Sequence, residues 1–192
     1  FVSDQTGWWN LYRWNSTHHE AVALCPMAAE FGRPQWALGM TTYGFTADGD
    51  IICTYAVNGE WRLGQLEKGE QLREIKTEYC AFNSLVISGQ RAVFIAGHSV
   101  DSSALVLLDL KAIDSMVVRR AMDINIDPKN ISIGMVIDVP SGDGIDVHAY
   151  FYAPVNINYS GPVCEKAPLI VKSHGGPTGQ TTQSFSLGIQ FW

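Results

Sequence analysis

The stretch that decides the fold is IICTYAVNGEWRLGQL, from Ile51 to Leu66. Its first half, Ile51 to Val57, is a short apolar run of the kind that forms a β-strand. Asn58-Gly59 follows, the strongest short-range hairpin signal, because both residues tolerate the positive φ angles of a tight turn. Trp61 to Leu66 returns as a second strand, and Lys68-Gly69 turns the chain again. The sequence therefore predicts an antiparallel hairpin at this point.

Runs of the same style lie on both sides of this hairpin, and helical periodicity is scarce from Phe1 to Ile126. The other predicted strands are Leu85–Ile87, Ala92–Ala96 and Ala104–Leu110. A turn followed by a strand recurs in three places: Thr6–Trp14, Asn58–Leu66 and Ser102–Leu110. A turn pair also recurs, as Asp48-Gly49 and Ser88-Gly89. A period of roughly 40–50 residues with about four short strands is typical of β-propeller blades, with a generic β-sandwich as the alternative. We predict about three blades over residues 1–128, fewer than the roughly 4–8 of a closed propeller, so we expect a fragment of a larger protein.

The style changes after Asp127-Pro128. Ile131–Val139 and Val147–Tyr152 alternate apolar and polar residues on either side of a Gly-rich turn, which predicts a second hairpin. Leu169-Ile170-Val171 is a continuous apolar run, typical of a strand buried on both faces of a mostly parallel sheet. A second domain, of α/β type, is therefore predicted to occupy residues 129–192.

One motif carries chemistry: His174-Gly175-Gly176-Pro177 directly follows the predicted buried strand. Acyl transfer creates a tetrahedral oxyanion, which is stabilised by N–H donors placed about 3 Å away. A glycine pair allows the backbone to approach that oxygen closely and to adopt positive φ angles. In α/β-hydrolases the loop after the third strand supplies such a donor from an HGGG-type motif. A tight turn without any catalytic role is the alternative.

The chain resembles the prolyl oligopeptidase (S9) family of serine peptidases, in particular its dipeptidyl aminopeptidase and acylaminoacyl-peptidase branch. The matching stretches are Ser3–Tyr12, Glu30–Trp36, Tyr43–Phe45 with Asp48-Gly49, His148–Pro154 and Pro168–Thr178. The resemblance implies C-terminal β-propeller blades followed by the first strands of an α/β-hydrolase domain, in a mainly β chain truncated before the nucleophile. It also implies an oxyanion hole lined by Gly175 and Gly176, with His174 where relatives carry an oxyanion-binding tyrosine.

Other residues give weaker signals. No Gly-x-Ser-x-Gly nucleophile elbow is present, and neither Ser173 nor Ser184 lies in such a context. The histidines outside the motif are expected to be a solvated turn (His18-His19), a loop residue without a nearby partner (His98) and a structural strand residue (His148). The tryptophans, which could stack on a sugar or a base, are expected to fill the space between sheets: Trp8, Trp9, Trp14, Trp36 and Trp61.

Composition excludes several classes of partner. The formal net charge of -6, without a basic cluster, argues against nucleic acid, and no apolar run approaches the length of a membrane span. The four cysteines form no CxxC pair, so no metal and no cofactor are expected, and a reducing, cytoplasmic location is favoured.

These observations favour a fragment of a serine-type peptidase that cleaves short or N-acylated peptides through an acyl-enzyme. The chain by itself is expected to be inactive, because the triad serine, aspartate and histidine are expected downstream. Two alternatives stay open: a non-catalytic propeller that binds proteins or sugars, and an esterase or amidase of the same fold. Homo-oligomer formation also stays an open alternative.

Overall fold

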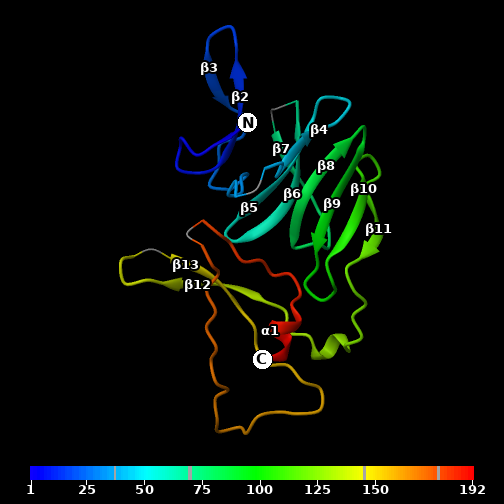
Figure 1. Ribbon diagram of the computed structural model, residues 1–192. Helices are drawn as coiled ribbons and strands as arrows, with labels where there is room; N and C mark the ends of the chain where they lie inside the picture. The colour runs from blue at the N-terminus through cyan, green and yellow to red at the C-terminus, as the bar shows by residue number, and fades with distance from the viewer. Residues whose placement is uncertain (37, 69–70, 145, 177) are drawn as a thin grey trace.

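The structure is a computed structural model. It describes residues 1–36, 38–68, 71–144, 146–176 and 178–192. Regular structure is almost entirely β, with 41% of the chain in strands and 4% in helices. Three antiparallel sheets occupy the N-terminal part of the chain, and a separate hairpin with a long irregular segment follows (Figure 1). The mainly β prediction is therefore confirmed.

Each of the three sheets is a meander in which consecutive strands are neighbours. The first sheet contains β1 (Val2–Ser3), β2 (Asn10–Asn15) and β3 (Glu20–Ala23). The second contains β4 (Tyr43–Phe45), β5 (Ile51–Val57), β6 (Glu60–Glu67) and β7 (Gln71–Ile75). The third contains β8 (Ala81–Ser88), β9 (Arg91–Gly97), β10 (Ala104–Asp109) and β11 (Asp114–Arg120). Two four-stranded meanders in succession are the architecture of propeller blades.

The sequence repeats fall at equivalent places in these sheets. Gly49 and Gly89, with φ angles of 88° and 62°, both lie in the turn between the first and second strands of a four-stranded sheet. Gly7 precedes β2 and Gly59 precedes β6, again with positive φ. Gly69, part of the predicted turn after β6, lies outside the described residues. The recurrence of turn glycines between strands explains why the repeat is visible in the sequence.

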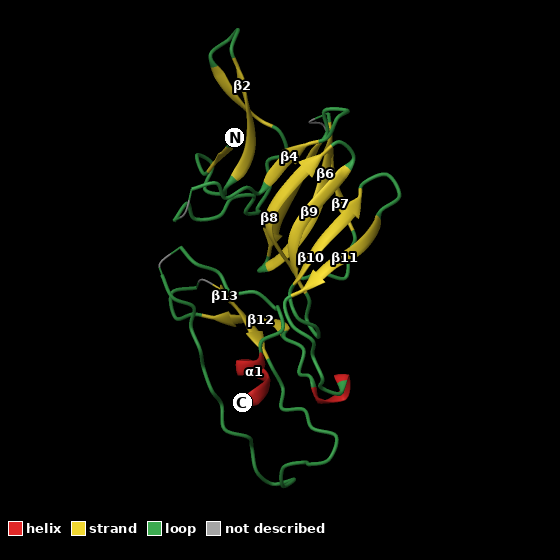
Figure 2. Ribbon diagram, turned by 45° about the vertical axis from the view of Figure 1, so that its right-hand side comes forward, coloured by secondary structure: helices red, strands yellow, loops and turns green. Residues whose placement is uncertain are grey.

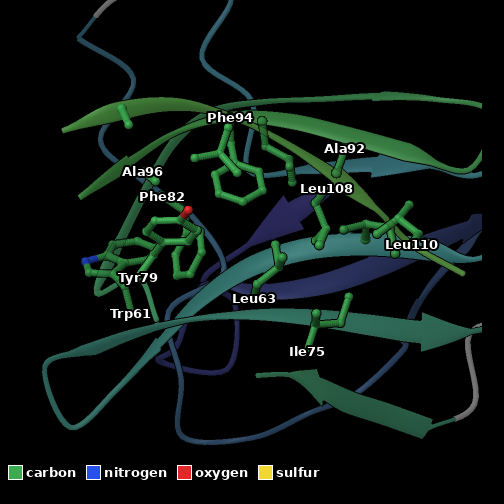
Figure 3. Packing of buried hydrophobic residues seen from close by; sticks show 14 of the residues in the cluster. Trp61, Leu63, Ile75, Tyr79, Phe82, Ala92, Phe94, Ala96, Leu108 and Leu110 are labelled. Atoms are coloured by element: carbon green, nitrogen blue, oxygen red, sulfur yellow. The ribbon is translucent and has the colours of Figure 1, made fainter. Parts of the chain in front are cut away.

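Strand β5 is the centre of the packing, because it is buried on both faces. Ile51, Cys53 and Tyr55 face the first sheet, in a cluster with Leu11 and Phe31. The alternate residues Ile52 and Ala56 face the third sheet, in the larger cluster shown in Figure 3. Since side chains on a strand alternate between faces, one continuous apolar run supplies both interfaces.

An arginine ties the second and third sheets together. The guanidinium carbon of Arg33, in the connection between β3 and β4, lies 3.7 Å from the ring centroid of Trp61 on β6. One guanidinium nitrogen also donates a hydrogen bond of 2.8 Å to the backbone oxygen of Phe82 on β8. Burial lowers the pKa of Arg33 from its usual value, and the side chain remains cationic because that value is so high. Its stacking and hydrogen bond offset part of the cost of burying the charge.

The C-terminal part begins with a short 3₁₀ helix, Pro128–Asn130, and then forms the predicted hairpin. The hairpin strands are β12 (Met135–Pro140) and β13 (Asp146–Phe151), and a single helical turn, α1 (Leu187–Phe191), lies near the end (Figure 2). No helix in the described part of the chain is long and apolar enough to cross a membrane.

The predicted buried strand at residues 169–171 is wrong for this structure. Leu169, Ile170 and Val171 are 75%, 58% and 84% exposed, and they form no strand. A strand of a sheet requires at least one hydrogen-bonded partner strand, and no described residue pairs with this run. Residues 169–171 are apolar, as a buried strand requires, but no sheet among the described residues includes them.

The first prediction concerns the cluster between the second and third sheets. Phe94 is fully buried there, with its ring centroid 5.4 Å from that of Phe82. We expect Phe94→Ala to lower the free energy of unfolding by about 3–5 kcal/mol, because it leaves a cavity in the core. Urea denaturation measures this change.

The matched control is the neighbouring residue on the same strand. Ile95 points to the opposite face of β9 and is 43% exposed. Ile95→Ala should cost about 1 kcal/mol or less. Equal destabilisation by the two substitutions would contradict the packing described here.

Candidate functional site

The motif His174-Gly175-Gly176 lies in an exposed irregular segment that follows the apolar run at 169–171. Gly176 has a φ of +77°, a conformation that side chains other than glycine rarely adopt. The Nδ1 atom of His174 lies 3.3 Å from the backbone oxygen of Gly175. Pro177, the last residue of the motif, lies outside the described residues. Both glycines of the motif are therefore exposed, and Gly176 adopts a positive φ.

A tryptophan of the propeller lies against this motif. A Cβ atom added at Gly176 would lie 3.4 Å from both Cη2 and Cζ2 of Trp36, and one at Gly179 would lie 3.5 Å from Cη2. Trp36 belongs to the connection between β3 and β4, far from the motif in sequence. The fold thus brings an aromatic ring of the propeller to the glycine backbone of the motif.

The prediction that the tryptophans fill the space between sheets holds for one residue. Trp61 is 6% exposed, whereas Trp36 is 68% exposed. The remaining three are also partly exposed, at 43%, 38% and 55%: Trp8, Trp9 and Trp14. Trp8 and Trp9 lie between strands, Trp36 lies in a connection, and Trp14 is on an outward face of β2, so their positions do not place them between two sheets. The sequence did not distinguish Trp36 from the other four tryptophans, since only the tertiary fold brings it to residue 176.

The C-terminal segment is held against the propeller by hydrogen bonds to two loops. The backbone oxygen of Gly59, at the tip of the β5–β6 hairpin, accepts hydrogen bonds from the Tyr150 hydroxyl at 2.5 Å and from Nε2 of Gln180 at 3.3 Å. The backbone N–H of Phe185 donates to the oxygen of His98, after β9, at 2.8 Å. Figure 2 shows this segment beneath the sheets. The motif at 174–176 is therefore close to residues that are anchored to the propeller.

A polar cavity of about 410 Å³ opens beside these contacts. Its lining comes from three places: the start of β6 (Glu60, Trp61, Arg62), the end of β7 and the residues after it (Glu74, Lys76, Tyr79, Cys80), and Gln183. Arg62 lies 3.3 Å from a Glu60 oxygen and 3.4 Å from a Glu74 oxygen, so two carboxylates share one guanidinium in a network that stays net negative. The cavity therefore presents a charge-paired wall to the C-terminal segment.

The other histidines are separated from the motif. His18 and His19 lie in an exposed turn, as predicted. His98 has partners that the sequence did not reveal: its Nδ1 accepts from the backbone N–H of Val100, and its Nε2 lies 3.9 Å from a Glu78 oxygen. Among the described residues no group of three or more potential metal-binding side chains is brought together.

His148 forms a pair that sequence reasoning missed. Its Nδ1 lies 2.6 Å from Oδ1 of Asp138, the residue directly opposite on β12. The signal was available, because a hairpin whose turn includes Ser141–Gly144 places 138 and 148 opposite one another. The pair is exposed on the hairpin and does not contact the motif.

Neither serine near the motif is activated by an imidazole in the described structure. Ser184 accepts a hydrogen bond from the hydroxyl of Thr182 at 3.0 Å. Ser173 lies in the exposed segment directly before His174. Neither serine is therefore a nucleophile paired to a base among the described residues.

Comparison with known proteins gives close structural matches. The chain is similar to a puromycin-hydrolyzing peptidase of Mycobacterium tuberculosis, with 28% identity over 99% of this chain and a TM-score of 0.93. It is also similar to a puromycin hydrolase, with 28% identity over 99% of the chain and a TM-score of 0.90. A prolyl endopeptidase structure matches in fold at 12% identity over 78% of the chain, with a TM-score of 0.56. No family model and no curated protein matches the chain.

These matches establish the class, a β-propeller portion of a peptidase fold, and confirm the resemblance seen in the sequence. They support the similarity of the chain to the prolyl oligopeptidase (S9) family of peptidases. It spans 30% of the Mycobacterium peptidase and 29% of the puromycin hydrolase, and so corresponds to a fragment of such proteins.

The second prediction concerns the Tyr150 hydrogen bond to Gly59. Burial, followed by the nearby Tyr152, Cys80 and Glu60, raises the pKa of Tyr150 from its usual 10.0 to about 12. Between these two pH values the unfolded chain loses the phenol proton while the folded chain keeps it, so stability falls as pH rises. We expect Tyr150→Phe to cost about 1 kcal/mol at pH 8 and to remove part of the decline in stability between about pH 10 and 12.

Denaturant titration at pH 8 and at pH 11 measures both effects. Tyr159, which is 80% exposed, provides the control. Tyr159→Phe should leave stability and its alkaline decline unchanged. A Tyr150→Phe variant with the wild-type decline would show that this phenol is not protected by the fold.

Proposed function

We propose that the protein containing this chain is a serine-type peptidase in which His174-Gly175-Gly176 contributes backbone N–H groups to an oxyanion hole. The observation that carries the proposal is the positive-φ glycine backbone of the motif, in a chain that matches a puromycin-hydrolyzing peptidase over 99% of its residues. Residues 129–192 are proposed to be the first part of an α/β-hydrolase domain, since the motif follows an apolar run as in that fold. A cytoplasmic location is part of the proposal, supported by four free cysteines.

The proposed chemistry is acyl transfer to a serine outside this chain. A base removes the serine proton as Oγ attacks the carbonyl carbon, and the carbonyl π electrons move onto oxygen to form the oxyanion. N–H groups of the motif stabilise that charge in the transition state more than they stabilise the neutral carbonyl. Collapse of the intermediate expels the protonated amine and leaves an acyl-enzyme, which water hydrolyses.

The proposed substrates are short peptides, including those with a free or acylated N-terminus. Two structural neighbours carry names that refer to hydrolysis of puromycin, and a third structure is a puromycin hydrolase variant complexed with PGG. The proposal includes the dipeptidyl and acylaminoacyl specificities that the sequence suggests. The contacts between the propeller and the segment around the motif support a role for the propeller in limiting access to the site.

The third prediction tests the oxyanion role. In the full-length protein, Gly176→Val should lower kcat by about 10²–10³, because valine tolerates the positive φ poorly and displaces the N–H donor. KM should change much less, since the donor acts in the transition state. Steady-state kinetics on a peptide amide, with circular dichroism to verify folding, provide the measurement.

Gly161 is the matched control for that substitution. It lies in open space without a positive φ, so Gly161→Val should retain kcat. His174→Ala separates the backbone from the side chain: a mild effect indicates that only N–H groups contribute, and a severe one that the imidazole donates. Near-normal kcat in a folded Gly176→Val protein would reduce the motif to a turn.

The fourth prediction concerns the serine. A fluorophosphonate probe should label one serine of the full-length protein and should leave residues 1–192 unlabelled, because the described residues hold no serine paired to an imidazole. Mass spectrometry of the labelled peptide identifies the site. Saturable labelling of Ser173 or Ser184 would overturn the assignment of the nucleophile to another part of the protein.

A further inference from the structure

Trp36 is the large exposed aromatic residue that lies beside the motif, and the roles discussed so far do not use it. We propose that its indole ring is a specificity-determining surface of the substrate site, which receives an aromatic or large apolar side chain on the acyl side of the scissile bond. This inference rests on the proposed function, because it takes residues 174–176 as the site where the substrate carbonyl binds.

The Trp36 ring lies close to the backbone at which the substrate carbonyl is proposed to bind. An oxyanion donor works at about 3 Å from the oxygen that it stabilises. The Trp36 ring approaches to 3.4 Å from the Cβ position of Gly176 and 3.5 Å from that of Gly179. A carbonyl bound at the Gly176 backbone therefore lies within a few ångströms of the ring, about the reach of one side chain.

Most of the Trp36 side chain is available for contact with a ligand. Trp36 is 68% exposed, so its contact with the glycine backbone covers only a minor part of the ring. Indole offers a large, rigid apolar surface, and aromatic pairs prefer offset-stacked or edge-to-face contact with it. A ring that is held on one side and open on the other is suited to stacking with a ligand.

The connection between β3 and β4, which contains Trp36, also lines a cavity. Gln35, next to Trp36, lines a second cavity of about 410 Å³ together with Trp9, Met40 and Tyr43. This cavity presents mainly aromatic and aliphatic groups, in contrast to the charge-paired wall around Arg62. The neighbour of Trp36 in the connection therefore borders a cavity lined by uncharged side chains.

A specificity surface and a support for the loop have different kinetic effects. A residue that only supported the motif would affect every substrate equally, through kcat. A stacking surface affects substrates according to their side chain, through KM. The two roles are therefore distinguishable by comparing two substrates.

The experiment uses the full-length protein with the 4-methylcoumaryl-7-amides of phenylalanine and alanine. Trp36→Ala should raise KM for the phenylalanine substrate about tenfold, the equivalent of one lost aromatic contact, with little change for the alanine substrate. Trp36→Phe should restore most of the preference. Trp14→Ala, which removes a ring that is 55% exposed on β2, should change neither value.

A uniform fall in kcat for both substrates with unchanged KM would overturn the inference and leave Trp36 a support for the loop. Calorimetric binding of phenylalaninamide and alaninamide to the wild type and to Trp36→Ala gives a readout that does not require turnover. Preferential binding of phenylalaninamide that is lost in Trp36→Ala supports the inference even if both coumarin amides resist cleavage, a result that would count against the proposed function alone. Equal binding of the two amides by the wild type contradicts the inference.

Discussion

The structure depends on the burial of β5 from both sides. A four-stranded sheet leaves two apolar faces, and a single blade can cover neither by itself. Ile51, Cys53 and Tyr55 satisfy this requirement against the first sheet, while Ile52 and Ala56 satisfy it against the third. The middle sheet is consequently fixed in register with both neighbours, since a slip of one residue would exchange the two sets of side chains.

That packing determines where the loops of the sheets lie, and through them the position of the C-terminal segment. The hairpin after β5 presents the Gly59 carbonyl, which accepts two hydrogen bonds from residues after 129. The connection before β4 presents Trp36 to the glycine backbone of the motif. Arg33, in the same connection, is held by Trp61 and by the backbone of Phe82, so the base of this connection is anchored to two sheets. A rigid propeller face can in this way position residues on a segment that has little regular structure of its own.

The elements predicted from sequence are those that local signals specify. Turn glycines with positive φ recur at 49 and 89 because tight turns between strands need that conformation. The β12–β13 hairpin was predicted for the same reason. The prediction failed at Leu169–Val171, where a buried strand depends on partner strands rather than on its own residues. The prediction that Trp36 fills the space between sheets was also wrong. A tryptophan in a connection belongs to no periodic pattern from which its burial or its neighbours could be predicted.

The sequence by itself therefore determined the strands, the turns, the repeated blade pattern and the chemical identity of the motif at 174–176. These features depend on backbone preferences and apolar alternation over a few residues, which are local properties. Only the tertiary structure decided that Trp36 lies against Gly176, and that the Gly59 carbonyl binds Tyr150 and Gln180. It also decided that Trp61 is the one buried residue among the five tryptophans that were expected to fill the space between sheets. Such contacts join residues up to about 140 positions apart, and they form only when the stacking of sheets brings separate loops to one face.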